Sequence, residues 1–565
     1  MKNYLLTILL ITFYFNYGQY NEMQSQFKNA ALVIEGEVVS SNAYVDKITK
    51  NIYTDFTIAV SQTLKGGFDD TIIVTVPGGS VDGFFQIVTH QVKLANASKG
   101  LFFLNNKKSS SQLYFKDLNG FVNYKKQSAT ELTSIKNQML KIAPDFNDEV
   151  VESSKTPLVI NSYLNDTFSI TSFSPSELSA GSETELSIEG VGFGAFTGTV
   201  SFSQSDDGGE TLLDANSTDI VSWSDSLIIV RVPSDAGSGP ITVSKQDESS
   251  VTSIASLNIY FNYMRYNLED DFGNLKSYPL RHVGAMPSGA TPSYHNSDGA
   301  LRFKMKEAFY NNDHARLIFI EIMEEWSCKT GVNFIYEGVA SEFDMLETQN
   351  LISFADFEEN GYGGAAFASL SGFYICGEND QRELCVTQID ITYDSNINWG
   401  YESIANNQFD FKWTTTHEIG HAALFGHVID SNDLMHFSSA YGDRNFAGLQ
   451  QTYVNAGVDK VAFSNSFFLC GSPMDVSTCH TLSLKNSNDN PLKLYVLANR
   501  IEIQSPASAL SQFSLYDVAG KQIDSQLLLD SPHSFTYATD ALTKGLYFVR
   551  IDLSKNRSIT KKIML

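Results

Sequence analysis

The sequence predicts a multidomain protein in which one α+β domain is flanked by all-β domains. Its 565 residues exceed the usual size of a single domain, so several are expected. Strand-like patterns fill most of residues 20–262 and return from residue 492, whereas an amphipathic helix is predicted between them, at residues 313–328. The content of 42% hydrophobic and 12% aromatic residues is that of a folded chain.

The chain is acidic, with a formal net charge of -25, which argues against nucleic acids and anionic membranes as partners. Such a charge suits a soluble secreted protein, although solubility alone explains it. Residues 1–18 have the features of a secretory signal peptide, with Lys2, an apolar core over residues 4–15, and Gly18 as a small residue for cleavage. No later apolar run approaches the length of a membrane span, so we expect no transmembrane segment.

Residues 20–125 are predicted to form a small β-barrel or sandwich. Residues 31–39 are rich in β-branched side chains, and residues 53–60 alternate between apolar and polar side chains. No chemistry is assigned to this domain. Its histidine, His90, is expected to be solvated or packed, like the other isolated histidines of the chain. Residues 126–166 are expected to be a linker.

Residues 167–262 carry short strand-like segments separated by glycine and proline turns. They include Phe-Ser-Pro within residues 170–176, a glycine-rich run that ends at Gly194, and Ser-Trp-Ser-Asp at residues 222–225. Together these pieces resemble an IPT/TIG immunoglobulin-like domain, which is a β-sandwich. The resemblance implies a spacing or binding role. Residues 263–295 are expected to be an irregular linker.

Residues 296–465 are predicted to form the α+β domain. The helix at residues 313–328 has an apolar face, and a closing helix is expected near residues 446–453. Residues 466–491 are expected to be a linker. Strands are predicted at residues 331–336, 351–354, 364–368 and 388–393.

Three histidines and a glutamate in this domain form a pattern that can bind a catalytic metal. On a helix, His417 and His421 lie one turn apart on one face, where two imidazoles can share an ion. Glu418 can accept a proton from a metal-bound water. His427 completes a three-nitrogen site and leaves the fourth position open, as catalytic zinc requires. For His417 and His421 alone, the alternative is that both are ordinary buried or surface side chains that bind no metal. We predict a Zn²⁺ centre, with Ca²⁺ as a further candidate cofactor.

The pattern resembles the metzincin clan of zinc peptidases, in which H-E-x-x-H-x-x-G-x-x-H is followed by a Met-turn. The eight-residue step from His427 to Met435 is most similar to the matrixins. The resemblance implies that Met435 packs beneath the metal and that Phe437, which has no ligating atom, leaves three histidines plus water as ligands. Leu424 stands where the clan has glycine. Gly426 could supply the left-handed conformation, so the turn is expected to be built differently.

The resemblance implies a secreted zinc endopeptidase that acts on proteins or peptides. The strand with Gly364 and Ala366 is expected to pair with an extended substrate, and Tyr441 to wall the specificity pocket. One alternative is a non-catalytic surface adhesin or binding protein with a degenerate metzincin domain. The two β modules favour it, Leu424 leaves it open, and the intact Glu418 argues against it. Another is a zinc hydrolase that acts on a non-peptide amide.

The five cysteines are few but fit an exported protein. Proximity pairs Cys376 with Cys385 and Cys470 with Cys479, and it leaves Cys328 over, buried against a helix. All five lie after residue 296, so the preceding domains offer no thiolate that could bind the zinc.

Residues 492–565 are β-patterned again. The segments 513–521, 542–550 and 558–563 resemble the C-terminal sorting domain of type IX secretion. The resemblance implies the type IX secretion machinery as a partner, export through the periplasm, and a secreted or cell-surface location. An ordinary accessory β domain is the alternative.

Overall fold

The structure is a computed structural model with side chains. The predicted signal peptide lies outside the residues that it describes, as do most of residues 126–166 and 466–491. The described residues are 23–47, 49–67, 70–107, 112–116, 120–124, 135, 138–139, 141–143, 168–247, 249–269, 275–283, 299–340, 350–373, 384–438, 441–442, 444, 448–466, 473–477, 492–497, 500–505, 509–517, 521–528, 532–539, 541–543, 546–553 and 557–564.

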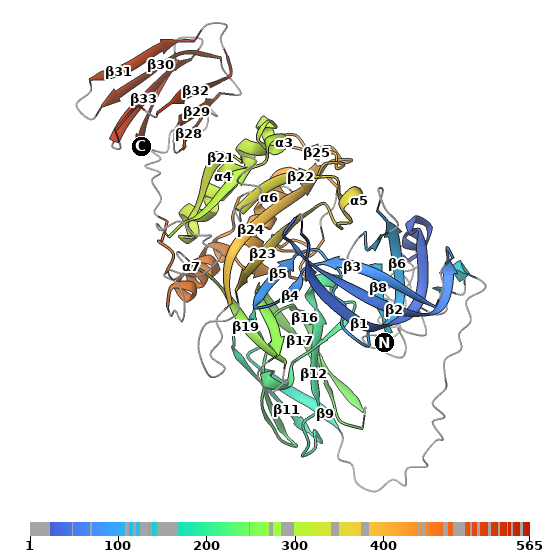
Figure 1. The fold of residues 1–565 in the computed structure, drawn as a ribbon. Helices are drawn as coiled ribbons and strands as arrows, with labels where there is room; N and C mark the ends of the chain where they lie inside the picture. Colours follow the sequence, from blue (N-terminus) through green and yellow to red (C-terminus); the bar gives the residue numbers. More distant parts are fainter. Residues whose placement is uncertain are drawn as a thin grey trace, which may run out of the picture.

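The first domain is a β-barrel, because its first strand pairs with β2 on one side and with β6 on the other. Alternating buried side chains such as Ile34 and Phe102 fill its interior. Two short strands, β4 (Gly79–Val81) and β5 (Phe84–Val88), leave the barrel and join the sheet of the third domain (Figure 1). The barrel strands are β1 (Leu32–Val45), β2 (Ile52–Lys65), β3 (Thr71–Pro77), β6 (Lys99–Asn106), β7 (Leu113–Tyr114) and β8 (Phe121–Asn123).

The second domain packs two sheets around one core that includes Leu186, Phe202 and Ile241. The first sheet has the order β10 (Glu177–Ala180), β17 (Ser250–Tyr263), β16 (Ala236–Ser244), β12 (Thr199–Gln204) and β13 (Leu212–Asp214). The second has the order β14 (Ile220–Trp223), β15 (Leu227–Arg231), β11 (Glu185–Val191) and β9 (Ser169–Ser174). Two short 3₁₀ turns, η3 (Ser205–Asp207) and η4 (Ser217–Asp219), follow β12 and β13.

The third domain is a mixed sheet that packs with helices around the largest core of the described residues. The sheet order is β21-β20-β22-β24-β23-β5-β4, with β23 antiparallel to its neighbours. Its strands are β20 (Leu301–Met305), β21 (Phe334–Val339), β22 (Asn350–Ala355), β23 (Ala366–Phe373) and β24 (Leu384–Asp394). A separate pair is β25 (Trp399–Gly400) with β26 (Phe409–Asp410). The helices are α3 (Glu307–Tyr310), α4 (Asp313–Thr330), α5 (Phe357–Asn360), α6 (Phe411–Ala422) and α7 (Gln451–Ser466).

Helix α4 follows the prediction closely, because Asn312 caps its first turn and Gly331 ends it in a left-handed conformation. Its Trp326 is fully buried against α6 and donates a hydrogen bond to the carbonyl oxygen of Thr416. The closing helix was expected near residues 446–453, but α7 begins at Gln451 and runs to Ser466.

The prediction of an irregular linker at residues 263–295 is wrong for its first half. The strands β18 (Arg265–Glu269) and β19 (Leu275–His282) form a hairpin, and β19 continues in parallel beside β24. Pro279 within β19 weakens a strand prediction because proline cannot donate to a ladder. Here it pairs with Arg265, at the start of the short β18.

The last domain packs two small sheets, and Figure 1 shows it as a lobe at one end of the molecule. Phe513 stacks on Tyr537 between them, with ring centroids 4.6 Å apart. One sheet contains β28 (Lys493–Leu497), β29 (Arg500–Gln504) and β32 (Ser534–Ala538). The other has the order β31 (Gln522–Leu527), β30 (Leu510–Asp517), β33 (Leu546–Leu553) and β34 (Arg557–Met564).

The predicted roles of two cysteines are wrong. Cys328 is disulfide-bonded, to a partner outside the described residues, so it is not left over. Cys385 is a buried thiol at the start of β24, which contradicts its pairing with Cys376. Proximity along the chain was the only basis for this pairing, and the Cys385 side chain is completely buried in the sheet.

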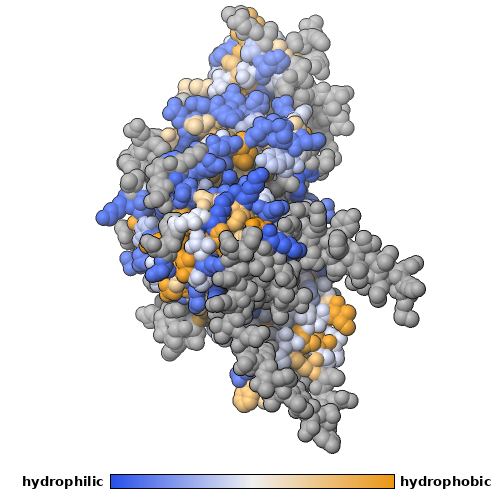
Figure 2. All heavy atoms as spheres, turned by 90° about the vertical axis from the view of Figure 1, so that its right-hand side faces the viewer, coloured by the Kyte–Doolittle hydropathy of each residue, from blue (hydrophilic) through white to orange (hydrophobic). Residues whose placement is uncertain are grey.

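The described surface on the face shown in Figure 2 is largely hydrophilic, with its apolar side chains in scattered groups. This agrees with the acidic composition. Within the described part of the chain, no helix is long and apolar enough to cross a membrane.

Candidate metal centre

Helix α6 presents two of the predicted ligands on one buried face. Asp410 caps the helix by accepting a hydrogen bond from the backbone N–H of Trp413, at 3.0 Å. His417 and His421 follow one turn apart, with ring centroids separated by 4.7 Å. Gly420 lies between them because a β-carbon there would collide with the sulfur of Met435. The methionine therefore packs directly against the helix, fully buried.

The turn from α6 to the third ligand is made by Leu424 itself. Its φ is 70°, in the left-handed region that glycine adopts easily. The expectation that Gly426 would supply this conformation is therefore wrong. Gly426 instead belongs to β27 (Phe425–Gly426), where a β-carbon would press on the side chain of Asn262 at 3.2 Å. Pairing of β27 with the end of β17 then fixes the path into His427.

Each of the three histidines has one ring nitrogen fixed by an acceptor. Nδ1 of His417 donates to the carbonyl oxygen of Leu434 at 2.7 Å, and Nδ1 of His421 donates to that of Phe425 at 2.8 Å. Nδ1 of His427 donates to a carboxylate oxygen of Asp206, also at 2.7 Å. Because these acceptors cannot donate, each Nδ1 carries the proton and each Nε2 keeps a lone pair.

The three Nε2 atoms are buried without a hydrogen-bond partner in the described part of the chain. Orphaned polar atoms in a core are costly unless something binds them. Burial also lowers the pKa of His417 and His421 well below the ordinary range, and it lowers the pKa of His427 to about 4 against the opposing effect of Asp206. Neutral imidazoles are what a metal ion binds, so these residues fit zinc.

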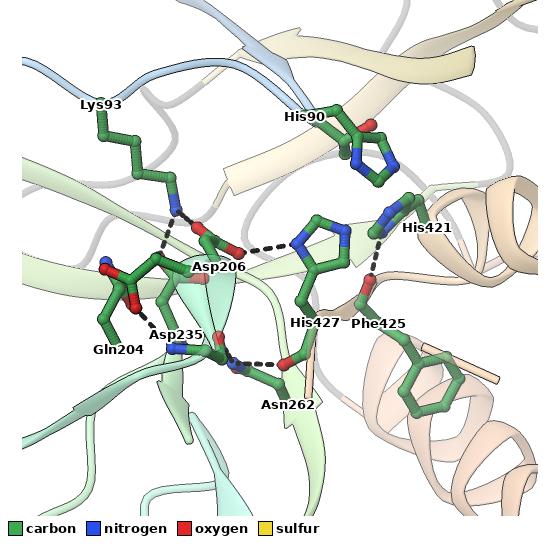
Figure 3. A network of polar contacts seen from close by, with 12 residues as sticks. His90, Lys93, Gln204, Asp206, Asp235, Asn262, His421, Phe425 and His427 are labelled. Atoms are coloured by element: carbon green, nitrogen blue, oxygen red, sulfur yellow. Dashed lines mark hydrogen bonds and ion pairs between the residues drawn. The ribbon is translucent and has the colours of Figure 1, made fainter. Parts of the chain in front are cut away.

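The second domain supplies the group that orients His427. Asp206, in η3, accepts the hydrogen bond from His427 and forms an ion pair with Lys93 at 2.7 Å (Figure 3). Lys93 also pairs with Asp235 at 2.6 Å. Burial would raise the pKa of Asp206, but the Lys93 ammonium and the His427 hydrogen bond hold it well below the usual range. A carboxylate behind a ligating histidine fixes the tautomer and raises the basicity of the ligand.

A fourth histidine reaches the same point from the first domain. His90 follows β5, and its ring centroid lies 4.6 Å from that of His427 and 5.3 Å from those of His417 and His421. One nitrogen from each of the four histidines lies within 4.8 Å of all the others. His90 is therefore a packed side chain that lies beside the three predicted ligands instead of apart from them. No spacing in the sequence connects it with the helix motif, so no local signal could have found it.

Glu418 lies at the edge of this group, almost fully buried. Its Oε1 is 3.3 Å from Nε2 of His90, and its Oε2 has no hydrogen-bond partner among the described residues. A cavity of about 250 Å³ opens beside it and is lined by both His417 and Glu418. The other predicted site residues, Gly364, Ala366 and Tyr441, line the same cavity, together with His90, Ala365, Ile397, Phe409, Trp413, Thr414, His436, Phe437 and Ser438.

The turn that carries Met435 is held by Asp433. Its carboxylate accepts hydrogen bonds from the backbone N–H of Met435, at 2.8 Å, and from the hydroxyl group of Tyr453 on α7. The cluster of potential metal ligands found among the described residues consists of four histidines. Ca²⁺ binds oxygen ligands, so this cluster does not test the Ca²⁺ prediction, which stays a prediction.

Comparison with known proteins identifies two of the domains. Residues 169–263 match the IPT/TIG domain, and residues 497–565 match the secretion system C-terminal sorting domain. The chain therefore contains an IPT/TIG immunoglobulin-like domain and a type IX sorting domain, and the latter indicates a secreted or cell-surface protein that uses the secretion machinery. Both predictions are confirmed. No curated protein matches the chain.

Solved structures resemble the chain only weakly. CopC from Methylosinus trichosporium OB3b is 19% identical over 14% of this chain and 86% of its own, with a TM-score of 0.11. The γ-CGTase of alkalophilic Bacillus clarkii is 13% identical over 46% of this chain and 29% of its own, with a TM-score of 0.13. Scores this low do not establish a shared fold.

Proposed function

We propose that this chain is a secreted, zinc-dependent endopeptidase of the metzincin type. The observation that carries the proposal is the convergence of three buried Nε2 atoms that have no hydrogen-bond partner among the described residues, next to a cavity lined by His417 and Glu418. The sequence order of these groups, the buried Met435 beneath α6 and the left-handed turn at Leu424 all agree with it.

The residues would have three roles: metal ligands, a general base, and a strand that pairs with the substrate. His417, His421 and His427 would hold the zinc, which when bound supplies a Lewis acid and a water with its pKa lowered to about 7. Glu418 would take the proton of the attacking water and pass it to the leaving amine. The backbone at Gly364 and Ala366, which also line the cavity, would align a peptide by strand pairing.

A metal assay combined with a cleavage assay tests the proposal. We expect about one zinc per chain by mass spectrometry, and chelator-sensitive cleavage of a denatured-protein mixture by the mature secreted form. Glu418→Gln should retain the zinc but lose turnover, because the ligands and the base are separate groups. Cleavage that survives both the chelator and this substitution would contradict the proposal.

A non-catalytic binding protein is the second candidate. One observation favours it: His90 lies where an open coordination position would be, and zinc sites closed by four protein ligands are structural. Such a protein would bind zinc but cleave nothing, even after the position beside Glu418 is opened.

A further inference from the structure

The edge of β23 next to Gly364 and Ala366, which are proposed to pair with the substrate, is already occupied by the first domain from Ala368 onward. Strand β5 pairs antiparallel with β23, from Val88 opposite Ser369 to Phe84 opposite Phe373. The next residue, Thr89, extends the ladder: its N–H donates to the oxygen of Ala368 at 3.0 Å, and its hydroxyl accepts from the Ala368 N–H at 2.9 Å. An extended substrate therefore cannot pair with this part of β23.

The residue after this ladder is turned into the metal centre. His90 has a φ of 56°, a left-handed conformation that is uncommon outside glycine. Such backbone outliers persist where surrounding contacts impose them, and they gather at functional sites. The conformation ends the strand and places the buried Nε2 of His90 beside the other three histidines, at 3.3 Å from Oε1 of Glu418.

Contacts on both sides hold the His90 segment in place. Before it, Phe85 is fully buried in the core of the third domain and stacks on Tyr266 with ring centroids 5.3 Å apart. After it, Lys93 is tied to Asp206 and Asp235 of the IPT/TIG domain (Figure 3). A segment clamped at both ends presents His90 as a preorganised group rather than a passing side chain.

We propose that the first domain is a built-in inhibitor of the metal centre, in which β5 fills the substrate edge and His90 supplies a fourth nitrogen ligand. Four imidazole ligands would fill the coordination positions that a structural zinc site uses and would leave none for water or a peptide carbonyl. The role of the first domain as an inhibitor rests on the proposed peptidase function, whereas the assignment of His90 as a metal ligand does not. Activity would require withdrawal of the segment that carries His90.

The test counts ligands rather than activity and uses the full chain. X-ray absorption of the zinc form should show four imidazole nitrogens in the parent and three in His90→Asn. Asparagine is chosen because it tolerates the left-handed backbone. His314→Asn, on the exposed side of α4, is the matched control and should keep all four.

A probe of the open position gives a second readout. Acetohydroxamate should bind the cobalt-substituted His90→Asn variant on the order of 100-fold more tightly than the parent, if the closed state makes up about 99% of the parent. Thr89→Pro, which removes the N–H bonded to Ala368 but keeps all four histidines, should shift the affinity in the same direction.

The outcomes separate this inference from the proposed function. Equal ligand counts and equal acetohydroxamate affinities in the parent and His90→Asn would overturn the assignment of His90. If the variant opens the centre and also gains cleavage of denatured protein, the inhibitory role stands. If it opens the centre but cleaves nothing, the ligand assignment stands, while the peptidase function and the inhibition that depends on it fall.

Discussion

Leu424 offers a sharp test of how the chain reaches the third metal ligand. Its side chain is fully buried in the core of the third domain, yet its backbone has a φ of 70°. Its N–H donates to His421 and its carbonyl oxygen accepts from Met264, so the turn is tied at both ends. We compare Leu424→Gly with Leu424→Ala, since both remove the buried side chain but only glycine is at ease in the left-handed region.

The two substitutions share the loss of the leucine side chain beyond its β-carbon, and they differ in terms that oppose one another. Truncating a buried leucine to alanine costs about 2–5 kcal/mol through lost burial and the cavity left behind. Alanine retains the left-handed penalty of roughly 1–2 kcal/mol, and glycine is released from it. Against this release, glycine loses roughly 0.5–1 kcal/mol through its more flexible unfolded chain and about 0.8 kcal/mol through the buried β-carbon that it lacks. Because these terms nearly cancel, Leu424→Gly should match Leu424→Ala in stability to within about 0.5 kcal/mol.

The measurement is urea unfolding of the metal-free chain, followed by tryptophan fluorescence. Trp326, Trp399 and Trp413 all belong to the core that contains Leu424, so the signal reports mainly on this domain. At an ordinary negative φ, alanine would be more stable than glycine at this buried position by about 1.3–1.8 kcal/mol. A measured difference of that size would mean that the turn is not left-handed, and the reasoning would be refuted.

Four further outcomes are expected. Asp206→Asn should weaken zinc binding about 10–100-fold in a chelator competition, whereas Asp214→Asn in the same domain should not; equal affinities would contradict the orienting role. Glu418→Gln, in the His90→Asn background, should lower peptide turnover about 10²–10⁴-fold at unchanged zinc content. Burial lowers the pKa of His427 from 6.5 to about 4, so the unfolded chain binds a proton at a higher pH than the folded chain does. The metal-free protein should therefore lose stability as the pH falls from 6.5 toward 4, and this loss should be smaller in His427→Gln. Deleting residues 492–565 should leave the metal centre intact but hold the protein in the periplasm, and export of the truncated chain would rule out the sorting role.

The parts of the centre that were predictable are those encoded by local spacing. A four-residue step on a helix brings His417 and His421 together in any protein, and the short chain to His427 limits where it can go. The conformation of Leu424 was not predicted, because a left-handed turn was expected to need glycine. The hydrogen bonds of the turn impose this conformation on leucine. His90 and Asp206 were out of reach because strand pairing and domain packing bring them in, and neither leaves a periodic trace in the sequence.

Three domains therefore meet at one small group of atoms. The third domain contributes three imidazoles, the first domain contributes His90, and the IPT/TIG domain contributes Asp206 behind His427. The IPT/TIG domain is thus more than a spacer here, because its β17 also pairs with the strand that leads into His427. A ligand that binds only the assembled form stabilises that assembly by mass action. A metal held by all four histidines would join the first and third domains, so withdrawal of His90 would both open the centre and loosen the contact between the two domains.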